Sequence, residues 1–479
     1  MRKSIINIIS CLLILATASC EDFTDIQPKG MNLLTSVDQL EMLLNYQYSF
    51  GSNDMKVMCG DMIYSFSNLV DQVNRPQKSR NVIMWTWDEG SLDLMAELTN
   101  SDEDYQNYYN AIGTIANPLL EKLDQSVGDE SKKRQIQCEA LTLRAFSHLM
   151  LVNKFAAAYN PSTAASTRGI IVMTEDVDIT VPQEQKTVEE VYSQILEDLD
   201  KAIQLDGLPT VAVNRMRFNK ACPYAVKALA LMYMQRWDEA ENAAKQALAI
   251  NSEMANLNTD FHDLYYGLFD IISKKPGTFV EDYFYTNEQE VLLFYPFSIW
   301  NQIESGHAHT SYIMTDLMMA ALGGYMMGQM YLGDANYVCT EDFDSGWNEG
   351  GLRVPQMYLV VAECELHKNN INAAMEALDK IRINRINPMI YQPLQGNVTN
   401  MNDAIAKYKQ TALGENLFSN FSFVDKKRWN EITGWEATYT RTIGDKTYEL
   451  RPGSKMWIFP LPLNSINVNP NLKQNYKDN

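Results

Sequence analysis

The sequence predicts a mainly α-helical protein, a helical-repeat scaffold with a second, irregular region of mixed helix and loop that carries short strands. Two observations lead to this fold class. Gly351–Arg385 has the pattern of two amphipathic helices joined by an asparagine-rich turn, and Tyr224–Asn251 has the same pattern earlier in the chain. The 479 residues exceed what a single core usually fills, so segments between and after the repeats must form a second region.

The two hairpins share the spacing of one bulky residue and two alanines. In the first copy the alanines are Ala228 and Ala240, and in the second they are Ala362 and Ala374. The small residues allow two helices to approach closely. The spacing resembles the tetratricopeptide repeat, a helix–turn–helix unit that stacks into arrays. The alternative is that the two segments are unrelated amphipathic hairpins.

The remaining elements follow from periodicity and turn residues. We expect further helices at 40–48, 105–123, 131–155, 188–205, 223–233 and 403–414. Residues 58–89 are mixed and strand-like, with Val82–Trp87 the most β-prone part, and Ile170–Met173 reads as a short strand. Residues 255–350 form an irregular insertion rich in aromatic residues and glycine, and the C-terminal end is expected to be extended between prolines.

The N-terminus predicts a lipoprotein signal peptide. Arg2 and Lys3 precede an apolar run that is too short to span a bilayer, and small residues come directly before Cys20. This order is typical of a bacterial lipobox, although Thr17 stands where leucine is more usual. Cleavage after residue 19 would make Cys20 the acylated first residue, and its acyl chains would hold the protein on a membrane. An ordinary secretion signal with an incidental cysteine is the alternative.

Motifs at both ends and between them resemble one family. Asp25-Ile26-Gln27-Pro28-Lys29-Gly30 follows the lipid cysteine, and Trp457-Ile458-Phe459-Pro460 opens a tail that includes Asn469–Asn475. The markers between these ends are Glu139–Phe146, Thr187–Tyr192, Asn287–Leu293 and Arg353–Leu359. Together, in this order, they resemble the SusD/RagB-family nutrient-binding lipoproteins of the Bacteroidetes outer membrane. Two departures are notable: of the E-x-x-R-W-x-D-L-x-R-W segment only Glu415 and Lys427-Arg428-Trp429 remain recognisable, and Asp316-Leu317-Met318 does not fit the family's D-x-R.

The resemblance implies an organisation and a partner. It implies a signal peptide at 1–19, a SusD-like N-terminal region with helical repeats at 20–260, and a C-terminal region at 261–479 with the aromatic-rich insertion and the last repeat hairpin. It also implies a surface-exposed, lipid-anchored protein that serves as the lid of a SusC-like TonB-dependent transporter. Its ligand would be an oligosaccharide or, as in relatives resembling RagB, a peptide.

Charge and motifs limit the chemistry. Without residues 1–19 the chain has 38 basic and 60 acidic residues, a net charge of −22, which disfavours nucleic acid and anionic membrane faces as partners. No phosphate-binding loop, zinc-protease or serine-hydrolase motif is present, so we expect no enzyme activity and no cofactor. His307-x-His309 lacks the further ligands that a metal site requires, and Asp342–Gly346 lacks the later glutamate of a calcium loop. The five cysteines that remain beside Cys20 show no C-x-x-C spacing, so no disulfide framework is expected.

Aromatic residues outside the repeats are the candidate ligand-binding residues. Trp85 and Trp87 lie two positions apart in the strand-like run, so both rings would emerge on one face. The other candidates are Tyr283, Tyr285, Trp300 and Trp347. Their flat apolar faces suit sugar rings, and nearby amides suit hydroxyl groups. The alternative for each is that its ring packs in the core.

Three functions remain open on the sequence alone. The first is a surface lipoprotein that captures an oligosaccharide, or a peptide, for a transporter. The second is a helical-repeat adaptor for protein segments, against which the rich insertion argues. The third is a lipid-anchored glycan hydrolase, for which a pair of catalytic carboxylates cannot be picked out by sequence spacing. We therefore expect a non-enzymatic nutrient-binding protein.

Overall fold

The computed structural model describes most of the chain. It covers residues 34–259, 280–286, 293–299, 302–308, 328–340, 348 and 350–476, apart from the single residues 47, 49, 51, 64, 66, 297 and 418. Within these ranges no helix combines the length and apolarity needed to cross a bilayer. The predicted lipid anchor Cys20 lies outside them.

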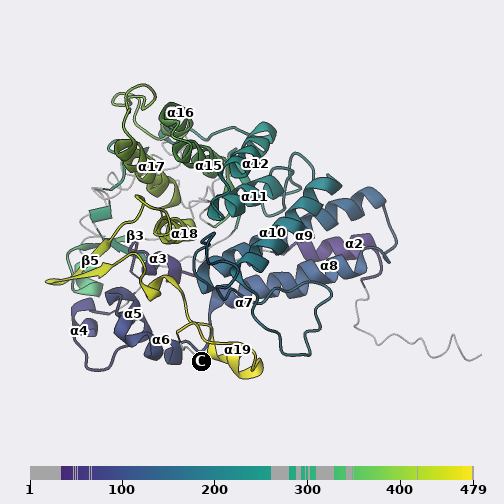
Figure 1. Cartoon of the computed structure of the whole chain (residues 1–479), viewed down its shortest axis with the longest axis horizontal. Coiled ribbons are helices and arrows are strands. Elements are labelled where there is room, and N and C mark those ends of the chain that lie inside the picture. The colour runs from purple at the N-terminus through teal and green to yellow at the C-terminus, as the bar shows by residue number, and fades with distance from the viewer. Residues whose placement is uncertain are drawn as a thin grey trace, which may run out of the picture.

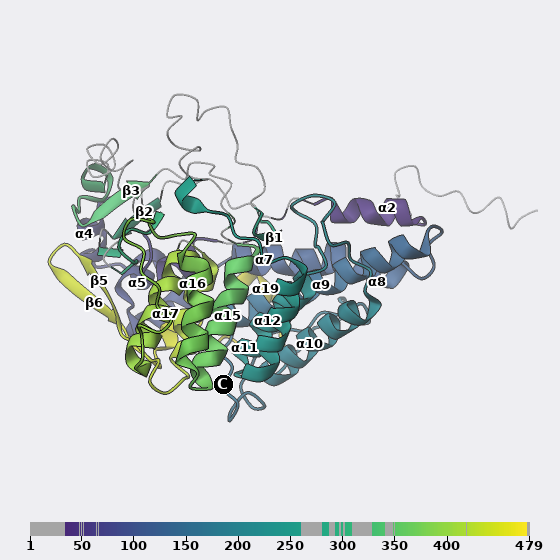
Figure 2. The same ribbon diagram turned by 90° about the horizontal axis from the view of Figure 1, so that it is seen from above.

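Successive helices pack side by side into an array. These helices are α9 (Glu130–Phe155), α10 (Val188–Leu205), α11 (Cys222–Tyr233), α12 (Trp237–Ile250), α15 (Val354–His367), α16 (Ile371–Arg382), α17 (Met401–Asn416) and α18 (Asn420–Trp429). Each contacts the next in this order, and Figure 2 shows the layer from α10 to α17. Local signals set the starts of the helices. Asp129 accepts a hydrogen bond from the Lys132 backbone N–H at 2.8 Å, and Thr187 forms a capping box with Glu190.

The two predicted hairpins are confirmed as α11–α12 and α15–α16. Their turns share one backbone feature: Gln235 (φ 60°) and Asn369 (φ 61°) hold left-handed conformations at equivalent positions. Ala362 and Ala374 are fully buried where α15 meets α16, as close helix approach requires. The fold class predicted from the sequence is therefore confirmed.

Shorter helices and three small sheets complete the described chain. The segment before α9 forms α2 (Val37–Glu41), η1 (Met42–Leu44), α3 (Asp54–Met58), α4 (Leu69–Val73), α5 (Arg80–Thr86), η2 (Glu89–Ser91), α6 (Leu92–Leu98), α7 (Glu103–Asn110), η3 (Ala111–Ala116) and α8 (Asn117–Lys122). The antiparallel strand pairs are β1 (Asp282–Phe284) with β4 (Leu352–Arg353), β2 (Leu293–Pro296) with β3 (Tyr337–Thr340), and β5 (Tyr439–Ile443) with β6 (Lys446–Leu450). The other short elements are η6 (Gly328–Leu332), η7 (Lys455–Trp457) and α19 (Leu463–Val468).

The molecule is elongated along the array. In Figure 1, α2 and α8 lie at one end of the long axis and the β5–β6 hairpin lies at the other. One apolar core runs from Val37 to Leu472 and includes residues of α9, α11 and α15, and a second cluster fills the space between α15, α16 and α17. The chain's C-terminal segment returns to α9, where the Phe459 backbone N–H donates to the Lys154 carbonyl at 3.1 Å.

Two predictions of strands are wrong. Val82–Trp87 is not a strand, because residues 80–86 form helix α5, which Ser79 caps by accepting a hydrogen bond from the Val82 backbone N–H at 3.3 Å. The β-prone run is short, and its apolar residues are buried on the helix, so tertiary packing overrides β-propensity. Ile170–Met173 has no strand partner in the described chain and lies in a loop whose Ile170 and Ile171 are buried.

Buried ion pairs join segments that lie far apart in sequence. Arg144 forms two 2.8 Å hydrogen bonds with Asp198, and Arg217 binds both carboxylate oxygens of Glu139. These pairs tie α9 to α10 and to the segment before α11. Glu139 and Arg144 belong to the family-like stretch in α9, so these residues have a structural role here.

Candidate ligand-binding site

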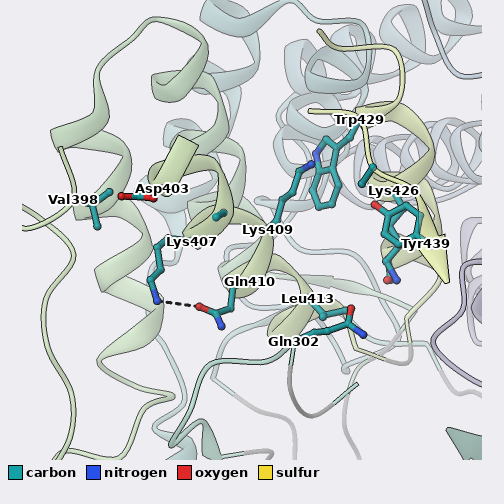
Figure 3. A pocket seen from close by; sticks show the side chains of 13 residues that line it. Gln302, Val398, Asp403, Lys407, Lys409, Gln410, Leu413, Lys426, Trp429 and Tyr439 are labelled. Atoms are coloured by element: carbon teal, nitrogen blue, oxygen red, sulfur yellow. Dashed lines mark hydrogen bonds between the residues drawn. The ribbon is translucent and has the colours of Figure 1, made fainter. Parts of the chain in front are cut away.

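A cavity of about 570 Å³ lies between α17, α18 and the start of β5. Figure 3 shows its lining side chains. Four residues of α17 form a stripe that faces the cavity: Asp403, Ala406, Gln410 and Leu413. Lys407 and Lys409 lie on either side of this stripe, and three residues of α18 face the cavity at helical spacing. The lining comprises Asp403, Ala406, Lys407, Lys409, Gln410 and Leu413 of α17, Ser422, Lys426 and Trp429 of α18, and Gln302, Val398, Ala437 and Tyr439.

The two helices that build the cavity begin at sequence-encoded caps. Asn400 accepts a hydrogen bond from the Asp403 backbone N–H at 2.9 Å, and Ser419 accepts one from the Phe421 backbone N–H at 3.2 Å. Three consecutive basic residues, Lys426 to Arg428, occupy the last turn of α18, where positive charge is favourable. The caps and this charge pattern fix where the two helices begin and end, and Trp429 of α18 contacts Tyr408 of α17.

Aromatic rings form one wall of the cavity. Trp429 packs edge-on against Tyr408 with ring centroids 6.0 Å apart and lies 6.2 Å from Trp435. Its side chain is only 4% exposed, so the cavity meets a small part of the indole. Tyr439 lies further along the same wall, where the Lys426 ammonium is 5.1 Å from its ring centroid. The wall thus offers apolar surface next to charged and amide groups.

The three lysines of the cavity differ in their partners. Lys426 is buried, forms an ion pair with Asp61 and donates to the Cys59 carbonyl at 3.3 Å. Burial lowers its pKa but the Asp61 carboxylate outweighs burial, so the pKa is raised. Lys407 donates to Gln410 at 3.0 Å and lies 3.8 Å from Glu304, which already binds Arg382.

Lys409 differs from both because the groups that it contacts directly, a backbone carbonyl and two indole rings, carry no negative charge. Its ammonium donates to the Trp435 carbonyl and lies 5.1 and 5.8 Å from the ring centroids of Trp429 and Trp435. No carboxylate of the described residues lies within ion-pair distance of it. Burial lowers the pKa of Lys409 below its usual value and outweighs the opposing effect of the Glu363 and Glu436 carboxylates.

The structure places four of the predicted site residues in buried positions away from the cavity. Trp85 is 3% and Trp87 5% exposed, and the Trp87 indole N–H donates to the Met58 carbonyl at 2.7 Å. The expectation that both rings emerge on one face of a strand is wrong, since Trp85 lies in α5 and Trp87 caps its C-terminus. Tyr283 is 2% exposed and Tyr285 is covered by the Arg215 guanidinium, 4.0 Å from its ring.

The remaining predicted residues stay predictions. Trp300, Trp347 and the lipidation residue Cys20 lie outside the residues that the structure describes, as do His309 and the calcium-like stretch Asp342–Gly346. Ligand contact stays a prediction for each of the six aromatic candidates. In the described ranges no group of three or more His, Cys, Asp or Glu side chains is arranged to hold a metal.

His307 is a buried residue, not an exposed polar residue of a loop. It is 4% exposed, its backbone forms an isolated bridge with Ile386, and burial lowers its pKa to about 4, with opposing effects from Glu415 and Arg385. Free buried thiols are found at Cys59, Cys138, Cys222 and Cys364.

Sequence reasoning missed the cavity itself. Lys407 and Lys409 lie in a predicted helix, and Trp429 stands out in the sequence only as part of a family-like segment. One signal was available, because Asp403, Ala406, Gln410 and Leu413 follow helical spacing with polar and small residues where a core-facing stripe would be apolar. Their partners on α18 and at Tyr439 are distant in sequence, so only the fold brings them together.

Residues 22–233 match the model of the SusD-like family described as "Starch-binding associating with outer membrane". This part of the chain is therefore similar to the SusD-like family. No curated protein matches the chain.

Solved structures share the SusD-like fold over nearly the whole chain. A SusD superfamily protein from Bacteroides thetaiotaomicron has a TM-score of 0.65 at 15% identity, over 92% of this chain and 100% of the other. A SusD-like carbohydrate binding protein from Bacteroides vulgatus gives 0.56 at 17%, covering 91% and 97%. Surface glycan-binding protein A from Bacteroides uniformis gives 0.62 at 14%, covering 91% and 99%. At these identities the likeness concerns the fold.

Proposed function

We propose that this protein binds an oligosaccharide at the outer membrane and delivers it to a SusC-like TonB-dependent transporter. The observation that carries the proposal is the match of residues 22–233 to a family described as starch-binding and outer-membrane associated. Two of the structural relatives are described by their carbohydrate or glycan binding. No reaction is required for this role, which is binding and transfer.

The cavity between α17 and α18 suits such a ligand. Its volume of about 570 Å³ lies within the range of ~300–1,000 Å³ that small-molecule sites usually span. Leu413, Val398 and the edge of Trp429 supply apolar contact for the faces of sugar rings, and Gln302 and Gln410 supply amides for hydroxyl groups. We therefore assign ligand binding to this cavity, with Trp300 and Trp347 retained as further candidates.

A screen of the soluble chain tests the proposal directly. Residues 21–479, without the signal peptide and Cys20, are applied to an array of glycans and peptides, and calorimetry then measures the affinity of each hit. We expect glycan hits and no peptide hits. Peptide hits alone would favour a RagB-like role, and an array without any glycan hit would refute the proposed function.

One substitution links the hit to the cavity. Ala406 is exposed on the α17 face that lines the cavity, so Ala406→Trp fills it without removing a buried side chain. We expect binding to fall by about tenfold or more, with the melting temperature unchanged. Ala249→Trp, at an exposed position of α12, is the matched control and should bind as wild type. Equal affinity of both variants would place the site elsewhere.

The anchor and the partner require separate experiments. Cys20→Ala should release the full-length protein from washed membranes of cells that lack the transporter, because the acyl chains would be its only membrane attachment. Retention in those membranes would contradict the lipobox. Affinity purification from outer membranes should recover a SusC-like transporter, and recovery of the lipoprotein alone would contradict the delivery role.

A further inference from the structure

The charge of the cavity is opposite to that of the chain. The protein carries 60 acidic and 40 basic side chains, yet the cavity is lined by three lysines and a single carboxylate, Asp403. Exposed charges further apart than the screening length of about 8 Å interact weakly at physiological salt. The potential that a bound ligand experiences is therefore set by the lining residues and by their direct partners, which include the Asp61 and Glu304 carboxylates, and the distant acidic surface contributes little.

Of the three lysines, Lys409 has a charge left to satisfy. Asp61 neutralises Lys426, and Lys407 shares Glu304 with Arg382. An ammonium has three donors, and Lys409 uses one of them on the Trp435 carbonyl. Figure 3 shows its side chain extending from α17 alongside Trp429. A partly buried cation beside an aromatic wall and without a carboxylate partner is a favourable place for an anion.

The acidic side chain that lines the cavity does not fill this role. Asp403 lies at the opposite end of the α17 stripe from Leu413, in the first turn of the helix, and its carboxylate accepts a hydrogen bond from the Asn400 amide. It is exposed and is held by its own helix cap. Two further carboxylates, Glu363 and Glu436, act on Lys409 from a longer distance, but Glu363 binds Arg428 and Glu436 accepts from the Gly434 backbone N–H. An acid group of a ligand would therefore be the first direct ion-pair partner of Lys409 within the described residues.

We propose that the cavity selects an anionic glycan, a sugar that bears a carboxylate or sulfate group, and that Lys409 binds the acid group while Leu413 and the Trp429 edge contact the ring. Lys407 adds a second positive charge on the other side of the α17 stripe. The inference rests on the proposed glycan-binding function and specifies its substrate class. An acid group at Lys409 replaces water with a charge-assisted hydrogen bond, which a neutral sugar does not offer.

Matched pairs of glycans test the inference. The probes are oligosaccharides that contain uronic acids, each with its carboxyl-reduced neutral counterpart, and sulfated oligosaccharides, each with its desulfated counterpart. They are measured by calorimetry against residues 21–479. We expect the acidic member of at least one pair to bind about tenfold tighter, with a difference that shrinks as salt is raised. The uronate and sulfate arms identify the acid group.

Lys409→Met tests the residue. It keeps most of the side-chain volume but removes the charge, so the ratio of the affinities for the acidic and the neutral member should fall from about tenfold to about one. Lys380→Met, at an exposed position of α16, should leave both affinities unchanged. Unchanged melting of both variants checks the fold.

The outcomes separate the inference from the function on which it rests. Neutral members that bind as tightly as acidic ones, or a preference that survives Lys409→Met, would overturn the anionic-glycan assignment and leave glycan binding in place. Binding of acidic peptides without any glycan would overturn both. No binding to any glycan, neutral or acidic, would refute the proposed function itself.

Discussion

Buried cations in the helical array and in the cavity are compensated in different ways. In the array, Arg144 meets Asp198, Arg217 meets Glu139, and Arg385 meets both Glu281 and Glu415. Near the cavity, Lys409 donates to a backbone carbonyl and lies over indole rings. The array satisfies its charges internally, which suits a scaffold. The cavity leaves positive charge available, which suits a site that receives a ligand.

Two neighbours of the cavity show a third solution. Lys427 donates to the carbonyls of Asn153, at 2.7 Å, and Ala156 at the C-terminus of α9, and burial lowers its pKa to about 7. Arg441 donates to the carbonyls of Trp85 and Val57 and lies 4.6 Å from the Trp87 ring. Both cations hold several carbonyls and so fasten segments together. Lys409 donates to a single carbonyl, so it contributes less to holding segments together and is better placed to bind a ligand.

The largest expected effect comes from breaking a compensated pair. Arg385→Met leaves the fully buried Glu281 and Glu415 without this guanidinium, and loss of one partner of a buried pair typically costs about 3–5 kcal/mol. Lys409→Met leaves no carboxylate unpaired and should change the free energy of unfolding by less than about 1 kcal/mol. Urea unfolding followed by circular dichroism measures both. Equal losses of stability in the two variants would show that Lys409 contributes as much to folding as the paired Arg385, and would contradict the distinction between scaffold and cavity.

Acid should weaken the scaffold through His148. This histidine is fully buried in α9, and its Nε2 accepts a hydrogen bond from the Met173 backbone N–H at 3.1 Å. Burial, with help from the nearby Arg144 charge, lowers the pKa of His148 to about 3 from 6.5. Between about pH 6.5 and pH 3, His148 is therefore protonated in the unfolded chain but neutral in the folded chain. The associated stability is complete above about pH 6.5 and falls as pH drops towards 3, a loss of about 3 kcal/mol by pH 4.

His148→Gln isolates this contribution, because glutamine does not titrate and its amide oxygen can accept the same hydrogen bond. Its free energy of unfolding should fall less than that of wild type between pH 6.5 and pH 4. Parallel curves for the two proteins would contradict the assignment. Lys409→Met should run parallel to wild type in this range, since a lysine stays protonated there.

Overpacking the repeat contact should cost less. Ala362→Trp forces a large ring into the fully buried contact between α15 and α16, and such insertions typically cost about 1–3 kcal/mol. Ala249→Trp, at an exposed position of α12, controls for the ring itself. Thermal melting compares them. An unchanged melting temperature for Ala362→Trp would count against close packing of the hairpin.

The sequence predicted the repeats well because their signals are local and long. The 18 residues of α10 have helical periodicity, and a capping box marks the start of the helix. The predicted bounds 188–205 are confirmed. Val82–Trp87 was misread because six residues cannot separate a buried strand from a buried helix by periodicity, although Ser79 gave the helix cap. The β5–β6 hairpin was missed for a similar reason: its strands are short and partly exposed.

The candidate site was much less predictable. Aromatic residues outside the repeats were expected to face a ligand, yet Trp87 and Tyr283 fill the core and use their polar atoms on backbone carbonyls. Burial depends on which segments fold over a ring, and that is not a local property. The positive charge of the cavity was hidden for the same reason. Lys426 and Lys409 look alike in sequence, and only the distant Asp61 gives one of them, Lys426, an ion-pair partner.

The smallest expected effect compares the two repeat turns. Gln235 and Asn369 both hold left-handed backbone conformations, which cost most residues about 1–2 kcal/mol. Glycine removes that strain, but its greater freedom in the unfolded chain takes back about 0.5–1 kcal/mol. Gln235→Gly should therefore stabilise the protein by about 0.5–1 kcal/mol. Asparagine tolerates this conformation better than glutamine, so Asn369→Gly should change stability by less. Urea unfolding of both variants decides the matter, and a larger gain at Asn369 than at Gln235 would mean that the two turns, despite equal φ angles, are held by different forces.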